Sequence, residues 1–177
     1  MSTNASLTSP GSASCGGTLI NRYYILTAAH CFASVQASHF DRYFAVVGAQ
    51  YRNDTNSVRY TIKSIIIHSQ YDSDTYENDI ALVQLSLPVD FNDSTVGFSC
   101  LPPNGAVNYP NESMNATALG WGSLEQGGSS AYALQQVELP IVSNQNSYCA
   151  DVLVTSSTQF CAGFISGGKD TCQGDRY

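Results

Sequence analysis

Short apolar runs bounded by Gly, Pro, Asn and Asp dominate the chain, and this pattern is typical of β-strands joined by turns. A turn-rich stretch at 102–115 divides the runs into two groups. Strands are predicted before it at 17–20, 23–27, 44–51, 58–67 and 80–85. Strands are predicted after it at 117–121, 134–142 and 159–164, and short helices at 144–153 and directly after Ala28. Many short strands at this spacing favour an all-β barrel or sandwich.

The composition supports one folded domain and argues against three other classes of protein. The 177 residues suffice for a single hydrophobic core. Eleven Tyr and seven Phe, with only 12% charged residues, argue against a disordered chain. A net charge of −7 argues against nucleic-acid binding, because phosphates require Lys and Arg. No apolar run approaches the roughly 18 residues that span a bilayer, so no membrane partner is expected.

Six cysteines in a chain of this size indicate an oxidising compartment. None of them has the C-x-x-C spacing of a zinc ribbon or a redox motif, and no metal or cofactor is expected. The acids near 72–77 also lack the spacing of a calcium loop. Spacing alone does not choose among the possible disulfide pairings. The cysteines are Cys15, Cys31, Cys100, Cys149, Cys161 and Cys172.

Five N-x-[ST] sequons also favour a secreted protein, although such triplets arise by chance in a chain rich in Asn, Ser and Thr. They begin at Asn4, Asn53, Asn92, Asn111 and Asn115. The first 14 residues contain neither the basic segment nor the apolar segment of a signal peptide. We therefore expect that the sequence lacks its true N-terminal part.

Two residues stand out as candidates for catalysis, but neither is decisive alone. His30 lies where a β run meets small residues, and on that evidence it is more often an ordinary, partly buried histidine. His39 and His68 have no comparable context. Asp79 precedes a buried strand, where an acid is usually a turn or cap residue. A carboxylate there can also fix the tautomer of a neutral histidine and stabilise its charged form.

Five short motifs occur together along the chain. They are Cys-Gly-Gly-Thr-Leu-Ile at 15–20, Thr-Ala-Ala-His-Cys at 27–31, Asn-Asp-Ile-Ala-Leu at 78–82, Gly-Trp-Gly at 120–122 and Lys-Asp-Thr-Cys-Gln-Gly-Asp at 169–175. Any one of them is a moderate signal. In this order and at this spacing, the sequence resembles the trypsin-like, or chymotrypsin-family, serine proteases.

The resemblance implies an all-β, chymotrypsin-like double Greek-key β-barrel. The chain would be a single peptidase domain, incomplete at both ends. The first barrel would span 15–101 and be largely present, the linker would span 102–115, and a partial second barrel would span 116–177. A half-closed second barrel would leave strand edges exposed.

The resemblance also assigns roles to five residues. His30 would be the general base and Asp79 the acid that orients it. Asp170 would form the floor of the specificity pocket and pair with a substrate Lys or Arg. Gly174 would supply an oxyanion-hole N–H group, and Asp175 would pair with the new N-terminus after zymogen cleavage.

The cysteines take their assignments from the same resemblance. Cys15–Cys31 and Cys149–Cys161 match two bridges of the family. Cys172 matches a cysteine whose partner lies further downstream, and Cys100 matches one that pairs with an upstream propeptide in some members. These two cysteines are therefore predicted to be unpaired.

One departure from the family pattern bears on activity. Arg176 occupies the position of the nucleophilic serine, and no other Ser lies in a G-x-S-x-G context. The chain is therefore predicted to be an inactive piece of an endopeptidase that cleaves after Lys or Arg. The alternative is a non-catalytic protease homologue that acts by binding. Expected partners are polypeptide substrates or inhibitors of the parent enzyme, and the chain is expected to be a monomer.

Overall fold

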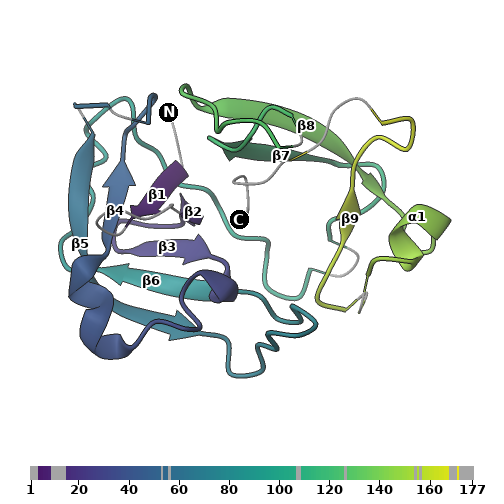
Figure 1. The fold of residues 1–177 in the computed structure, drawn as a ribbon, viewed down its shortest axis with the longest axis horizontal. Helices are drawn as coiled ribbons and strands as arrows, with labels where there is room; N and C mark the ends of the chain where they lie inside the picture. Colours follow the sequence, from purple (N-terminus) through teal and green to yellow (C-terminus); the bar gives the residue numbers. More distant parts are fainter. Residues whose placement is uncertain are drawn as a thin grey trace.

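The computed structural model contains a closed β-barrel and a separate three-stranded sheet (Figure 1). Within the described part of the chain, the connections are mostly turns, with three short helical segments. These are the 3₁₀ helices η1 (Ala29–Cys31) and η2 (Ala37–Arg42) and the α-helix α1 (Ser147–Ala150). The structure describes residues 4–8, 15–52, 54–55, 57–106, 109–125, 127–153, 155, 157–167 and 171.

The barrel has six antiparallel strands in the order β1-β2-β3-β6-β5-β4, and β1 pairs with both β2 and β4 to close it. Closure leaves no unpaired strand edge. The strands are β1 (Asn4–Thr8), β2 (Cys15–Leu19), β3 (Tyr24–Thr27), β4 (Phe44–Val47), β5 (Val58–Ile67) and β6 (Ala81–Leu85).

Strand β1 lies outside the range 15–101 that the sequence predicts for the first barrel. Ala5 and Leu7 are fully or almost fully buried and alternate with polar residues, which is the pattern of a strand with one face in a core. The alternation is only one period long and lies among Ser and Thr residues. The apolar pattern therefore did not identify strand β1, although the barrel needs this strand for closure.

The interior of the barrel is filled by alternating side chains from all six strands and by Phe32, which follows η1. Phe32 is the largest of the fully buried side chains, and its ring packs edge-to-face on Tyr43 with 5.5 Å between centroids. Gly17 of β2 has no room for a side chain. A Cβ there would lie 2.5 Å from Ile25 Cγ2, so this glycine permits close packing of β2 on β3.

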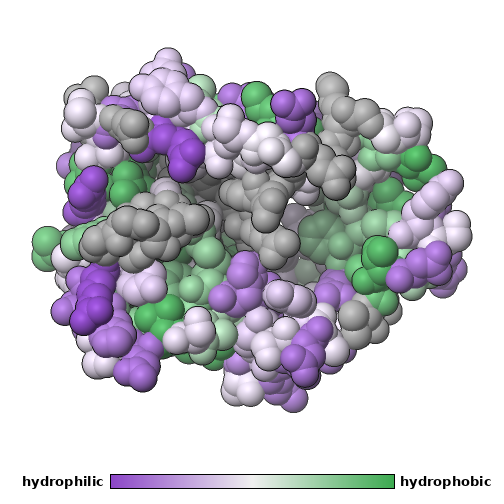
Figure 2. Space-filling view, in the orientation of Figure 1, coloured by the Kyte–Doolittle hydropathy of each residue, from purple (hydrophilic) through white to green (hydrophobic). Residues whose placement is uncertain are grey.

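The second sheet has the order β7-β8-β9, with strands β7 (Asn115–Gly120), β8 (Gln135–Val142) and β9 (Cys161–Ala162). Among the residues that the structure describes, β7 and β9 each pair only with β8, so this part of the fold is an open sheet. The expectation of a formed first barrel with a partial second one is confirmed. Figure 2 shows apolar residues beside β9 and α1 and also over the barrel, with polar residues between them.

The loop after β4 joins the barrel to the second sheet. The Gln50 carbonyl accepts hydrogen bonds from Leu134 N–H at 2.8 Å and from Trp121 Nε1–H at 3.3 Å. The rings of Tyr51 and Tyr132 stack with 5.2 Å between centroids. The chain leaves the barrel at Gly48 to make these contacts. Strand β4 therefore ends at Val47 and does not continue to residue 51, as the sequence predicted.

Candidate active site

His30 is held by its neighbours in η1 at one end of the barrel. The buried hydroxyl of Thr27 donates to the Gly16 carbonyl at 2.7 Å, which ties the end of β3 to β2. Ala29 is fully buried, and its carbonyl accepts hydrogen bonds from the N–H groups of Phe32 and Ala33. The small residues before His30 thus let the chain turn tightly against the core, which leaves the imidazole at the surface.

The register between β3 and β6 brings Asp79 to His30. Thr27 pairs with Ala81, so the residues just after β3 and just before β6 lie at the same end of the barrel. His30 Nδ1 lies 2.7 Å from Asp79 Oδ2, and the His30 backbone N–H donates to Asp79 Oδ1 at 2.8 Å. Each carboxylate oxygen of Asp79 therefore has its own partner atom on His30, which lies 49 positions earlier in the chain.

This arrangement fixes how the imidazole can react. A carboxylate accepts only, so in the neutral form of the imidazole this geometry favours the proton on Nδ1 and the lone pair on Nε2. The side chains of His30 and Asp79 are 23% and 21% exposed. The pair is therefore sheltered but still accessible, as a proton acceptor for an external group must be. A nearby carboxylate also stabilises the imidazolium that forms when Nε2 takes a proton.

The turn before Asp79 is shaped by its own side chains. Asp72 Oδ1 accepts hydrogen bonds from the N–H groups of Thr75 at 3.1 Å and Asp74 at 2.8 Å, and these bonds lower the pKa of Asp72. Tyr76 and Asn78 have φ values of 57° and 55°, a region that non-glycine residues rarely adopt. The turn thus stores strain directly beside the candidate site, as functional loops often do.

One tyrosine of this turn contacts His30, and a second, Tyr71, is influenced by the charge of Asp79. The Tyr76 ring lies edge-to-face with the imidazole, with 5.9 Å between centroids. Burial and the negative charge of Asp79 raise the pKa of Tyr71, so its phenol stays neutral near the carboxylate. Tyr76 is not among the site residues predicted from the sequence, although an aromatic residue within an otherwise polar turn three positions before Asp79 was a usable signal.

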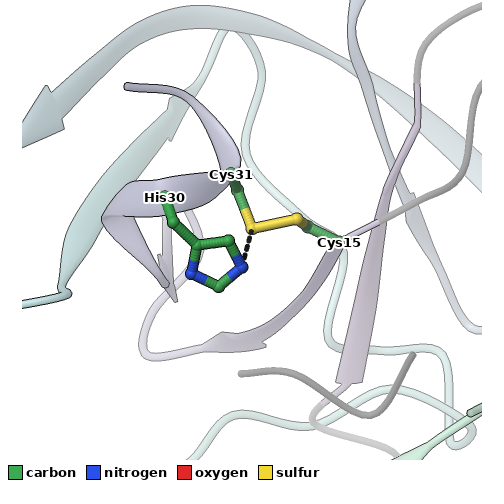
Figure 3. Close-up of side chains that lie close together, drawn as sticks. All are labelled: Cys15, His30 and Cys31. Carbon is green, nitrogen blue, oxygen red and sulfur yellow. Dashed lines mark hydrogen bonds between the residues drawn. A yellow bond between two sulfur atoms is a disulfide. The ribbon is translucent and has the colours of Figure 1, made fainter. Parts of the chain in front are cut away.

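A disulfide lies on the other side of the imidazole. Cys15 and Cys31 are bonded, and His30 Nε2 lies 3.8 Å from Cys31 Sγ (Figure 3). The donor atoms of Cys15, His30 and Cys31 lie within 4.8 Å of one another. Cysteine binds zinc as a thiolate, and both sulfurs are consumed by the disulfide, so the cluster as it stands does not fit a metal.

We expect removal of this bridge to destabilise the barrel. The bond joins residues 16 positions apart, and a loop of this length corresponds to about 3 kcal/mol of unfolding free energy in the chain-entropy account. Urea denaturation of a C15A/C31A double variant measures the loss. C100A is the matched control, because Cys100 is exposed and forms no disulfide with any described residue. Equal unfolding midpoints for C15A/C31A and C100A would contradict the expectation.

The remaining predicted site residues divide into two groups. The second bridge, Cys149–Cys161, is present and joins α1 to β9, and Cys100 is free. The other predicted positions lie outside the described residues, so the structure does not place them. These are Asp170, Cys172, Gly174, Asp175 and Arg176.

A His–Asp pair at the end of an antiparallel six-stranded barrel, followed by a second sheet, defines the class of serine-protease-like folds. A family model described as Trypsin matches residues 2–176. The chain belongs to the trypsin family of serine proteases.

Known proteins of this family align with most of the chain. Serine protease filzig of Drosophila melanogaster is 38% identical over 172 residues, which cover 91% of this chain and 10% of that protein. Trypsin eta of Drosophila melanogaster is 36% identical, and the match covers 91% of this chain and 60% of that protein. U21-ctenitoxin-Pn1a of Phoneutria nigriventer is 34% identical, and the match covers 91% of this chain and 68% of that protein. The chain thus spans between a tenth and about two thirds of the length of these relatives.

Within the part of the chain that the structure describes, no helix has both the length and the apolar character needed to cross a bilayer.

Proposed function

We propose that this chain belongs to a secreted endopeptidase that cleaves peptide bonds after Lys or Arg, and that it carries the general-base half of the catalytic machinery. The observation that supports this proposal is the double hydrogen bond between His30 and Asp79, at 2.7 and 2.8 Å. Such a pair activates a hydroxyl nucleophile, which is otherwise weak at neutral pH. The two disulfides are consistent with secretion.

The proposed roles follow from the chemistry of acyl transfer. His30 Nε2 takes the proton of a serine hydroxyl as the oxygen attacks the peptide carbonyl, and the imidazolium then protonates the leaving amine. Asp79 stabilises that imidazolium. Asp170 pairs with the Lys or Arg side chain of the substrate. The Gly174 N–H stabilises the oxyanion, and Asp175 pairs with an activated N-terminus.

The same proposal makes the 177-residue chain inactive, because Arg176 occupies the position of the serine. This residue also favours a second function, that of a non-catalytic homologue that binds polypeptide substrates or inhibitors as a monomer. Neither function requires a cofactor, a nucleic acid or a membrane.

Sequencing the transcript through the codon of Arg176 distinguishes the two functions. A reading frame that encodes Ser-Gly-Gly-Pro directly after Asp175 supports the peptidase. A verified Arg-Tyr sequence in a stably secreted protein supports the homologue and contradicts the catalytic role.

A further inference from the structure

A cavity of about 890 Å³ opens to solvent at the end of β8, and neither His30 nor Asp79 lines it. It lies between the segment before β7, the residues that follow β8 and the segment before β9. Its lining is rich in side-chain hydroxyls and amides, namely Asn111, Ser113, Ser143, Asn144, Gln145, Ser157, Thr158 and Gln159.

Charge and shape narrow the kind of group that this cavity fits. Among the described residues that line it there is no Lys, Arg or His, and Glu112 is the only charged one, so an anionic ligand is disfavoured. Tyr109 and Phe160 also line the cavity and are 52% and 53% exposed, so their rings are accessible. Hydroxyls and amides combined with accessible aromatic rings suit a neutral sugar, which has both polar groups and apolar C–H faces.

One wall of the cavity contains a candidate acceptor for such a sugar. Asn111 begins the sequon Asn-Glu-Ser, and its Oδ1 accepts hydrogen bonds from the Ser113 N–H at 3.0 Å and the Ser113 hydroxyl at 2.5 Å. Asn111 Nδ2, the atom that would bond a sugar, donates to no residue that the structure describes. The turn is fixed to β8, because Met114 N–H donates to the Asn111 carbonyl and Ile141 N–H donates to the Met114 carbonyl.

The sequon at Asn92 provides a contrast within the same chain. Its Nδ2 donates to Asp90 Oδ1 at 2.8 Å, and Asn92 does not line the cavity. Asn115 is exposed at the start of β7 and does not line the cavity either. Three sequons have an asparagine whose side chain the structure describes. Of these three asparagines, only Asn111 has an exposed amide that also lines the cavity.

We propose that Asn111 carries an N-linked glycan whose first sugars occupy this cavity. In the transfer step, Asn111 Nδ2 forms a bond to the anomeric carbon of a lipid-pyrophosphate-linked oligosaccharide. The anomeric C–O bond breaks, the lipid pyrophosphate leaves with the electron pair, and a base takes one amide proton. The inference relies on the secretory passage proposed above but not on any peptidase activity.

Glycopeptide mass spectrometry of the full chain, expressed with a cleavable leader in a eukaryotic secretory host, tests the modification. Protein from both the cells and the medium is analysed, so that the result does not depend on efficient secretion. We expect a glycan on Asn111, the loss of one glycan mass in both N111Q and S113A, and no loss in E112Q, which keeps the sequon intact. An unmodified Asn111, in either fraction, would overturn the proposal.

The rate of enzymatic deglycosylation tests whether the sugars occupy the cavity. We expect peptide N-glycosidase to release the Asn111 glycan about tenfold more slowly from the folded chain than from the denatured chain, which corresponds to about 1.4 kcal/mol. F160A should remove most of this protection, whereas L124A should not, because Leu124 is exposed and lies outside the cavity. Equal release from folded and denatured protein would overturn the placement of the glycan.

Discussion

The 177-residue chain is expected to show no turnover of an Arg-ester or Arg-amide substrate above background. The proposal places Arg176 at the serine position, and a guanidinium, which stays protonated at all working pH values, cannot act as a nucleophile. Removing the serine from a related triad lowers kcat by about 10⁶. The His30–Asp79 pair therefore has no hydroxyl to activate at that position, however well its geometry is formed.

Two assays test this expected inactivity. One measures hydrolysis of the substrate, and the other measures labelling by a fluorophosphonate, which reacts with activated serines. The matched control is H30A, in which the general base is removed and which should give the same background rate. Turnover that requires His30 and is accompanied by labelling of a serine would contradict the account.

Replacement of Phe32 by alanine is expected to have the largest effect on stability. Its side chain is 1% exposed at the centre of the barrel, and truncation of a buried Phe costs about 3–5 kcal/mol. The edge-to-face contact with Tyr43 is lost as well. Because Phe32 N–H also donates to Ala29 in the turn that holds His30, local loosening should reach the candidate site.

Urea denaturation of F32A against the unmodified chain measures this effect. L87A is the matched control, because Leu87 is 66% exposed and surface substitutions usually change stability by no more than about 0.5 kcal/mol. A loss for F32A no larger than that for L87A would mean that Phe32 does not fill the barrel core.

The strands that alternate clearly were predictable from the apolar pattern. The range 58–67 matches β5, and 134–142 differs from β8 by one residue. The pattern failed where tertiary contacts decide the structure. Strand β9 is only Cys161–Ala162 rather than 159–164, because its pairing with β8 is limited to two residues. The helix η2 at Ala37–Arg42 was not predicted, since it has no buried residue and so no apolar signal.

The candidate site was predictable only in part, for a physical reason. His30 and Asp79 are 49 residues apart, and the register between β3 and β6, not any local pattern, brings them together. The family resemblance supplied that link. An aromatic residue in the polar turn before Asp79 was a signal for Tyr76, but sequence patterns do not reveal the positive φ of this non-glycine residue or the contact of its ring with the imidazole.

The central claim is that Asp79 holds His30 with its proton on Nδ1 and so leaves Nε2 free to act as a base. Long-range ¹⁵N–¹H NMR of the imidazole in the intact chain tests it most directly. The account predicts that the neutral imidazole has a single Nδ1–H tautomer, which is lost in D79A and kept in D74A, a neighbouring exposed acid. A proton on Nε2, or an unchanged spectrum in D79A, would contradict it.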